Sequence, residues 1–182
     1  MKMASRKALI ELIASFCFLS SFVLLGTSTR QINQQRDLVS FACNNTLYVE
    51  ECLSSLRSEP LNETSDLRGL ASIALNLSIA HGEETKGYID DLKSKSGSES
   101  RCLNDCTEEY ADAVQNLEDS VHALRIRYYD KVTTLVSAAM TDSDTCEDCF
   151  GETEERESPL TERNQYFHKL CSNFLSITSL QF

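Results

Sequence analysis

Four cysteines in this sequence stand in two close pairs, Cys102 with Cys106 and Cys146 with Cys149. Their spacing is compatible with three kinds of chemistry. Four thiolates could hold a zinc ion, the Cys146-x-x-Cys149 pair could be a redox-active dithiol, and the four side chains could form two structural disulfides. The neighbouring residues and the cellular compartment decide between these interpretations.

The residues around the second pair argue against redox and calcium chemistry. Glu147 and Asp148 lie between the two cysteines, and their negative charges would raise the thiol pKa values that a redox dithiol needs to be low. The acidic segment that starts at Asp142 is similar in composition to a calcium-binding loop, but its sixth position is Glu147 instead of glycine and its twelfth is Thr153. We therefore predict no metal site and no cofactor.

The three histidines, His81, His122 and His168, stand far apart in the sequence. None belongs to a zinc-protease motif, and no serine nucleophile elbow accompanies them. Isolated histidines on helices are most often packing or surface residues. We predict that the chain is not an enzyme.

The first 28 residues have the pattern of a secretory signal peptide. Lys2, Arg6 and Lys7 precede an apolar run from Leu12 to Leu25, and small residues follow it. This run is shorter than the roughly 20 residues that cross a bilayer. We predict cleavage near residue 28, secretion, and no membrane attachment afterwards. In an oxidising compartment, disulfides compete with a zinc site for the thiolates.

The mature chain, residues 29–182, is strongly acidic. Residues 1–28 contain three bases and one acid, so the 17 Lys+Arg and 28 Asp+Glu of the whole chain become 14 and 27, a net charge of -13. Binding to nucleic acid phosphates requires the opposite charge, which excludes nucleic acid as an expected partner. The length suits one domain with a sizeable core.

The elements that must position the cysteines are helices. Glycine and proline are scarce, breaks are expected near Pro60, in residues 94–100 and in residues 151–159, and no segment alternates as a strand does. Two short helices, at 33–43 and 47–58, form an expected hairpin within residues 29–62. Four longer helices, at 65–95, 98–125, about 128–149 and from Ser158-Pro159 onward, predict an up-and-down antiparallel four-helix bundle over residues 63–182. The fold class is therefore all-α.

Apolar residues at steps of three and four define one inward face on each long helix. The residues expected to be buried are Leu67, Leu70, Ala71, Ala74, Leu77, Tyr88 and Leu92 on the first; Leu103, Cys106, Tyr110, Ala113, Leu117, Val121 and Leu124 on the second; Tyr128, Val132, Leu135, Ala139, Asp142, Cys146 and Cys149 on the third; and Phe167, Leu170, Phe174 and Ile177 on the fourth.

Seven cysteines remain after cleavage, and their placement on these helices predicts three disulfides and one thiol. Cys43 and Cys52 are close enough to join the two short helices. Cys106 and Cys146 lie on facing seams of antiparallel helices, which favours a bridge between them, and Cys102 and Cys149 lie one turn away in the same direction, which favours a second. Cys171 is interpreted as a buried, inert thiol, with an intermolecular bridge as the alternative.

The mature chain contains three N-x-Ser/Thr sequons, at Asn44, Asn62 and Asn76, which are relevant if the protein is secreted. Such sequons are acceptors for N-linked glycans in secreted proteins. We predict that these three asparagines are glycosylation sites.

Four segments together resemble the plant invertase and pectin methylesterase inhibitor family across essentially the whole mature chain. They are CNNTLYVEEC from Cys43 to Cys52, LNDCTEEYADAVQNL around Cys106, AAMTDSDTCEDCF around Cys146, and the last-helix segment SPLTERNQYFHKLCSNFLSIT. The resemblance implies a helical hairpin followed by a four-helix bundle, with bridges from Cys43 to Cys52 and from Cys106 to Cys146. Members usually have glycine at the position of Cys149, so the Cys102 to Cys149 bridge is an inference from this sequence alone.

The resemblance also implies a function. Members bind a pectin methylesterase, or a cell-wall or vacuolar acid invertase, and block its carbohydrate-binding cleft. The chain would then be a monomeric apoplastic inhibitor that forms a one-to-one complex with its target, with the vacuole as the alternative compartment. A helical bundle that carries a small apolar ligand, without inhibitory activity, is the alternative function.

The turn between the second and third long helices is the candidate contact with the partner. Well-understood invertase inhibitors of the family carry Pro-Lys-Phe there, whereas this sequence has Tyr129, Asp130 and Lys131. The difference favours pectin methylesterase as the target, with a divergent branch of the family that has other targets as the alternative. We predict Tyr129, Asp130 and Lys131 as partner-binding residues, because exposed aromatic side chains beside charges anchor many interfaces, and we expect Tyr128 to lie in the core.

Overall fold

A computed structural model of the chain describes residues 34, 36–59, 66–96, 101–152 and 158–181, and the predicted signal peptide and Asn62 lie outside these residues. Every regular element in the described part is a helix, as the apolar spacing predicted. None of its helices is long and apolar enough to cross a membrane. The chain divides after Leu38 into two compact units, and residues 39–182 form the larger one.

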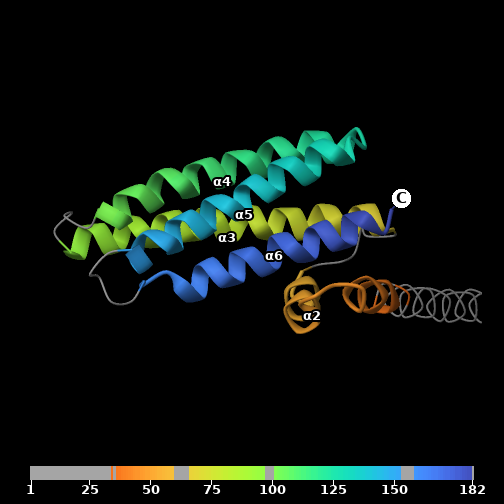
Figure 1. Cartoon of the computed structure of the whole chain (residues 1–182). Helices are drawn as coiled ribbons and strands as arrows, with labels where there is room; N and C mark the ends of the chain where they lie inside the picture. The colour runs from red at the N-terminus through yellow and green to blue at the C-terminus, as the bar shows by residue number, and fades with distance from the viewer. Residues whose placement is uncertain (1–33, 35, 60–65, 97–100, 153–157, 182) are drawn as a thin grey trace, which may run out of the picture. The chain divides into compact units, whose positions relative to one another are not determined.

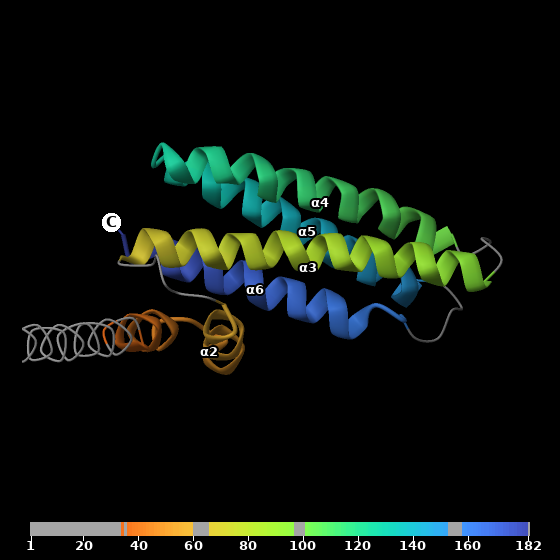
Figure 2. The same ribbon diagram turned by 180° about the vertical axis from the view of Figure 1, so that it is seen from behind.

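Four long helices form the bundle: α3 (Leu67–Ser96), α4 (Arg101–Arg125), α5 (Tyr129–Glu152) and α6 (Thr161–Ser179). Each helix packs against two others, in the order α3, α4, α5, α6 and back to α3, and the α4–α5 pair has the most extensive contact. Figures 1 and 2 show α4 and α5 running side by side above α3 and α6. The predicted up-and-down four-helix bundle is confirmed.

The short helix α2 (Val49–Arg57) packs on α3 and α6. The Cys43–Cys52 disulfide joins it to a preceding helix that ends at Cys43. Two polar contacts attach this segment to the bundle: Lys169 Nζ lies 2.6 Å from Glu51 Oε1, and Asn173 Nδ2 donates to the Tyr48 carbonyl at 3.0 Å. Because a segment of this size buries little apolar area alone, the bridge and these bonds hold it in place.

Two further disulfides join α4 to α5, Cys106–Cys146 and Cys102–Cys149, with Cα separations of 4.7 and 5.6 Å. These are the two pairs that the helical register favoured. Cys171 is free and fully buried, and burial raises the pKa of its thiol to about 12. A thiol that is buried and protonated at physiological pH is unreactive, as expected for an inert core residue.

The buried faces differ from the predicted ones on three helices. On α3 the inward face continues through Ser78, Gly82, Thr85 and Ile89, so Tyr88, Leu92 and Leu77 are only half-buried. This face was not predicted, because several of its residues are small or carry a hydroxyl group and do not count as apolar in a periodicity pattern. Their hydroxyls are satisfied within the helix: Ser78 Oγ donates to the Ala74 carbonyl at 3.0 Å, and Thr85 Oγ1 to the His81 carbonyl at 2.8 Å.

On α4 the prediction fails near the end of the helix, where Val121 is 42% exposed and Ser120 is buried instead. On α5 the buried residues are Val132, Val136, Ala139, Ser143, Cys146 and Phe150, whereas Leu135, Asp142 and Cys149 are half-buried. Tyr128, expected in the core, is 54% exposed. The prediction for Tyr128 fails because the spacing was carried across the turn, whereas α5 begins only at Tyr129.

The inward face of α6 is as predicted, with Phe167, Leu170, Phe174 and Ile177 buried. The helix begins two residues later than expected, at Thr161, so Pro159 precedes it. Ser158 does not cap the helix directly, although its Oγ accepts a hydrogen bond from the Leu160 backbone N–H at 3.1 Å.

Candidate partner-binding surface

The α4–α5 turn, residues 126–128, has a fixed backbone. The Tyr128 N–H donates to the Ala123 carbonyl at 2.9 Å, and the Arg127 N–H to the Leu124 carbonyl at 3.1 Å. This pair of bonds is the Schellman motif, which ends a helix through one residue in the left-handed conformation. Arg127 is that residue, with φ of 61°. Glycine is the usual choice there, so an arginine costs about 1–2 kcal/mol.

Two large apolar side chains stand exposed on either side of Arg127. Ile126 is 56% exposed and Tyr128 is 54% exposed. Exposed aromatic and aliphatic residues on a rigid backbone are typical anchors of protein interfaces. A strained residue held between two exposed apolar ones is a combination that often marks a functional site.

The three residues predicted to bind a partner lie in the first turn of α5. Asp130 and Lys131 are exposed, whereas Tyr129 is half-buried and its hydroxyl donates to Gln181 Oε1 at 3.4 Å. The structure thus brings these residues beside Ile126 and Tyr128. Ile126 and Arg127 were not predicted as partner-binding residues, because no glycine in the sequence signals the left-handed position.

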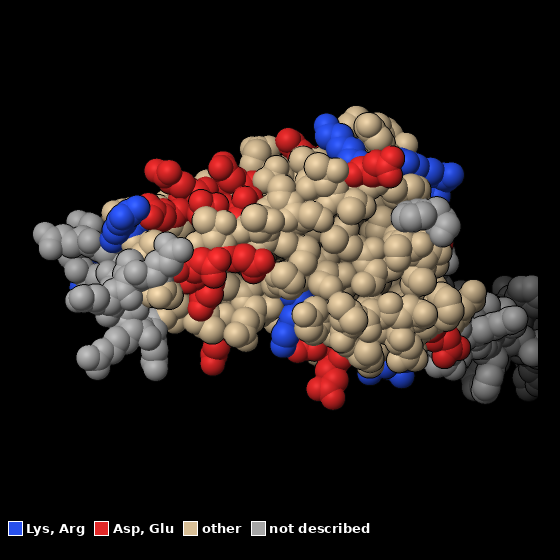
Figure 3. Space-filling model, in the orientation of Figure 1, with Lys and Arg blue, Asp and Glu red and all other residues tan. Residues whose placement is uncertain are grey.

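Charge is distributed unevenly over the bundle. Figure 3 shows acidic side chains gathered over the left half of the molecule, whereas basic ones are scattered; two basic groups with an acidic side chain between them lie at the upper right, where Figure 1 shows the α4–α5 turn. The bases next to the turn in sequence are Arg125, Arg127 and Lys131. The turn is therefore the basic end of an acidic protein.

The acidic patch on α4 and α5 consists of Asp105, Glu108, Glu109, Asp112 and Asp142. Partial burial, followed by the charges of Asp142 and the other patch acids, raises the pKa of Glu109. Partial burial also raises the pKa of Asp142, although Asn116 Nδ2 donates to its Oδ2 at 3.2 Å and favours the charged form. These shifts indicate carboxylates that repel one another.

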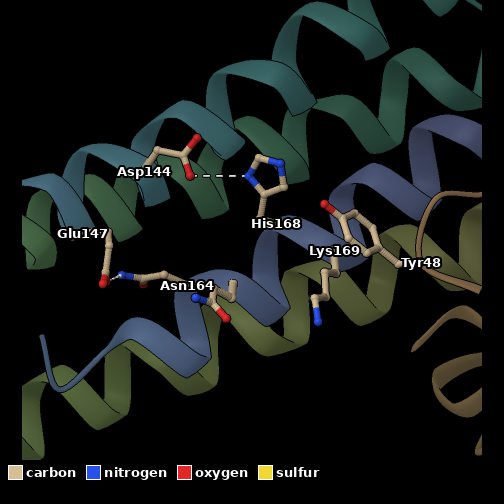
Figure 4. Close-up of a pocket in the computed structure, with 7 residues that line it drawn as sticks. Tyr48, Asp144, Glu147, Asn164, His168 and Lys169 are labelled. Atoms are coloured by element: carbon tan, nitrogen blue, oxygen red, sulfur yellow. Dashed lines mark hydrogen bonds and ion pairs between the residues drawn. The ribbon is translucent and has the colours of Figure 1, made fainter. Parts of the chain in front are cut away.

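A second surface feature is a groove of about 330 Å³ where α5 and α6 meet the segment before α2 (Figure 4). Its lining residues are Tyr48, Asp144, Glu147, Asn164, Gln165, His168 and Lys169. Asp144 Oδ1 lies 3.4 Å from His168 Nδ1. No serine, threonine or cysteine is among the described residues that line the groove with this pair.

One wall of the groove is anchored in the core. The Tyr110 hydroxyl donates to Asn164 Oδ1 at 2.6 Å, and Asn164 Nδ2 donates to Glu147 Oε2 at 2.6 Å. The Thr161 hydroxyl donates to the other oxygen of Glu147. This network orders the side chains of Glu147 and Asn164 on this wall of the groove.

The remaining candidate residues lie outside the turn and the groove. His81 is partly buried and its Nε2–H donates to the Arg163 carbonyl at 3.0 Å, and desolvation lowers its pKa. His122 is exposed and accepts from Arg125 Nη2 at 2.8 Å. Asn44 and Asn76 are both exposed. Among the described residues, no three His, Cys, Asp or Glu side chains are placed to hold a metal ion.

Comparisons with known proteins agree with this architecture. A Platanus acerifolia protein that carries an invertase-inhibitor name is 37% identical over 131 residues, which are 71% of this chain and 73% of that protein. Pectinesterase inhibitor 10 of Arabidopsis thaliana is 32% identical over 168 residues, 85% of this chain and 54% of that protein. The crystal structure of a mutant form of a pectin methylesterase inhibitor from Arabidopsis superimposes with a TM-score of 0.64 at 25% identity and covers 76% of this chain and 93% of that one.

The sequence profile of one family matches most of this chain. The profile is that of the plant invertase/pectin methylesterase inhibitors, and it matches residues 37–177. This range includes all six bridged cysteines and the α4–α5 turn. The chain therefore belongs to the plant invertase/pectin methylesterase inhibitor family, whose members inhibit enzymes and are not themselves catalysts.

Proposed function

We propose that the mature chain is a secreted, monomeric inhibitor that forms a one-to-one complex with a pectin methylesterase or an acid invertase and blocks its active-site cleft. The observation that carries this proposal is the exposed pair Ile126 and Tyr128 on the rigid α4–α5 turn. Tyr129, Asp130 and Lys131 extend the proposed contact along the first turn of α5.

Rigidity is the physical basis of the proposal. The α4–α5 hairpin is closed at one end by the turn and at the other by two disulfides, about 30 Å away along α4 at 1.5 Å per residue. A partner that binds this end does not have to order it first. Less conformational entropy is lost on association, which raises affinity for a given contact area.

A ligand-carrying bundle receives less support. Such a bundle needs an interior cavity, and the described core positions between the helices are occupied by large, fully buried side chains such as Tyr110, Phe167 and Phe174. The groove between α5, α6 and the segment before α2 lies at the surface.

Relatives of this chain carry the names of both kinds of inhibitor, so the target has to be measured. Purified, oxidised protein is assayed against a panel of plant pectin methylesterases and acid invertases at micromolar concentration. We expect inhibition of a pectin methylesterase, because the turn lacks Pro-Lys-Phe. Inhibition of invertases alone would reverse that choice, and inhibition of no enzyme in the panel would contradict the proposal.

The contact surface is tested with matched variants. Ile126→Ser combined with Tyr128→Ser removes two exposed anchors, each worth more than about 1 kcal/mol if it is an interface hot spot, so inhibition should weaken at least tenfold. Leu47→Ser removes an apolar side chain that is 81% exposed on the segment before α2 and should leave inhibition unchanged. Equal inhibition by the double variant and by the wild type would exclude the turn as the contact.

A further inference from the structure

The first half of α3 and the last turns of α4 enclose a second surface cavity, of about 260 Å³. Figure 2 shows the start of α3 beside the end of α4, as their antiparallel packing requires. The cavity is lined by Arg68, Ser72, Leu75, Asn76, Val121, Leu124 and Arg125. Its volume equals that of roughly nine water molecules at about 30 Å³ each.

The floor of this cavity is apolar and its rim is polar. Leu75 and Leu124 are buried beneath it, and Val121 is 42% exposed at its side. Arg68 and Arg125 supply guanidinium donors, and neither forms an ion pair with another described residue. An apolar floor with hydrogen-bond donors at the edge suits a sugar ring, which has a C–H face and a rim of hydroxyl groups.

Asn76 places an attachment point at the edge of this cavity. It is exposed, and with Leu77 and Ser78 it forms an N-x-Ser sequon. Arg68, Ser72 and Asn76 follow one another at intervals of four residues, so they share one face of α3. Because side chains on a helix lean toward its N-terminus, the Asn76 side chain covers the surface above Ser72 and Arg68.

We propose that Asn76 is N-glycosylated and that the first N-acetylglucosamine of the glycan occupies this cavity, against Val121 and between Arg68 and Arg125. The assignment rests on the secretion that is part of the proposed function. The glycan covers Val121. It does not cover Ile126 and Tyr128 on the α4–α5 turn, because these two residues do not line the cavity.

The modification is a transfer from a polyprenyl-diphosphate-linked oligosaccharide. Asn76 Nδ2 forms a bond to the anomeric carbon of the sugar while the bond from that carbon to the diphosphate oxygen breaks. The polyprenyl diphosphate leaves with the electron pair of the broken bond. One amide proton of Asn76 goes to a base of the transferase.

The position of Ser78 determines when this transfer takes place. The sequon requires its hydroxyl, but Ser78 is fully buried in the folded chain and its Oγ donates to the Ala74 carbonyl at 3.0 Å. A transferase cannot reach this hydroxyl after α3 has packed. Glycosylation of Asn76 therefore precedes folding, as the chain enters the secretory pathway.

Occupancy of Asn76 is tested on the full chain secreted from plant cells. Peptides are treated with a peptide N-glycosidase in heavy-oxygen water, which converts a glycosylated asparagine to labelled aspartate, and are read by mass spectrometry. We expect the label at Asn76. Unlabelled Asn76 in the secreted protein would overturn the proposal.

The seat of the glycan is tested by hydroxyl-radical footprinting. Val121 should be oxidised several-fold more slowly in the wild type than in Asn76→Gln or in Ser78→Ala, which removes the sequon and keeps Asn76. Asn44→Gln removes another exposed sequon asparagine and should leave Val121 protected. Equal oxidation of Val121 in the wild type and in Ser78→Ala would overturn the assignment. Enzyme inhibition by the same preparations is measured separately, and its absence would contradict the proposed function without affecting the footprint.

Discussion

The hydroxyl of Tyr110 donates a hydrogen bond of 2.6 Å to Asn164 Oδ1 in the buried interior of the bundle. The bond joins α4 to α6, two helices that do not pack as neighbours. Asn164 in turn donates to Glu147 on α5 at 2.6 Å. One asparagine side chain therefore links three helices across the bundle.

Removing the Tyr110 hydroxyl should destabilise the fold. Tyr110→Phe leaves the Asn164 carbonyl oxygen without this donor in a buried site, and we expect a loss of about 1–3 kcal/mol in the free energy of unfolding. Urea unfolding followed by circular dichroism measures it. The control is Tyr88→Phe, which keeps the ring that Arg163 stacks on at 4.4 Å and should change stability by less than about 0.5 kcal/mol. Equal stability of Tyr110→Phe and the wild type would show that the bond contributes nothing.

Replacing Arg127 by glycine should stabilise the fold. Glycine adopts φ of 61° without steric cost, so Arg127→Gly should gain about 1 kcal/mol. Arg125→Gly places glycine two residues earlier, inside α4, and should lose about 1 kcal/mol. The two midpoints of urea unfolding should therefore move in opposite directions from that of the wild type. A loss of stability in Arg127→Gly would mean that the arginine side chain makes contacts that outweigh the backbone strain.

Removing both disulfides between α4 and α5 should lower the free energy of unfolding by more than the sum of the two single removals. By itself, the Cys106–Cys146 bridge closes a loop with a sequence separation of 40, and the Cys102–Cys149 bridge closes one with a separation of 47. Once one exists, the second closes an effective loop of only about 9 residues, worth about 2.6 kcal/mol in the chain-entropy treatment. Removing one bridge by a pair of Cys→Ala changes should cost about 2.6 kcal/mol, and removing both about 6.5 kcal/mol.

A double-mutant cycle on the unfolding free energies measures this difference. The cost of removing both bridges should exceed the sum of the two single removals by about 1.3 kcal/mol. The Cys43–Cys52 bridge closes a separate loop, so its removal should add to either without coupling. Strict additivity of the two α4–α5 bridges would contradict the loop argument.

Asp142 should make stability depend on pH. Burial raises its pKa above 3.8, the Asn116 hydrogen bond lowers it, and the charge of Asp112 raises it, with a net upward shift. A carboxyl with a raised pKa in the folded state lowers stability when both states are ionised, and this loss is relieved as the pH falls through the folded pKa toward 3.8. Asp142→Asn should therefore be more stable than the wild type at neutral pH, by about 0.5 kcal/mol for a partly screened group.

This advantage of Asp142→Asn should vanish below pH 3.8, where the wild-type carboxyl is protonated in both states. Urea unfolding of both proteins across this range tests the sign. The matched control is Asp119→Asn, which alters an exposed aspartate that also accepts from a neighbouring amide, Gln115 Nε2, at 3.1 Å. If the stability of Asp142→Asn relative to the wild type increased as the pH fell, the carboxylates of the acidic patch would not repel one another.

The amino-acid sequence by itself was sufficient to predict the helical fold, the three disulfide pairs and the family. These features follow from local chemistry: apolar residues at steps of three and four bury one helix face, and the spacing of the cysteines along two antiparallel helices favours the observed pairing. Cys106 and Cys146 illustrate this, because both are fully buried where α4 and α5 face each other.

Only the tertiary structure determined which side chains are exposed at the ends of helices and which polar side chains are buried by neighbouring helices. Tyr128 was expected in the core because its spacing matched the seam, but the left-handed Arg127 reverses the chain and leaves Tyr128 exposed beside Ile126. The inward face of α3 passes through Ser78, Gly82 and Thr85, whose burial follows from their neighbours and not from their polarity. The candidate surface depends on backbone conformation and side-chain packing, which a periodic pattern does not encode.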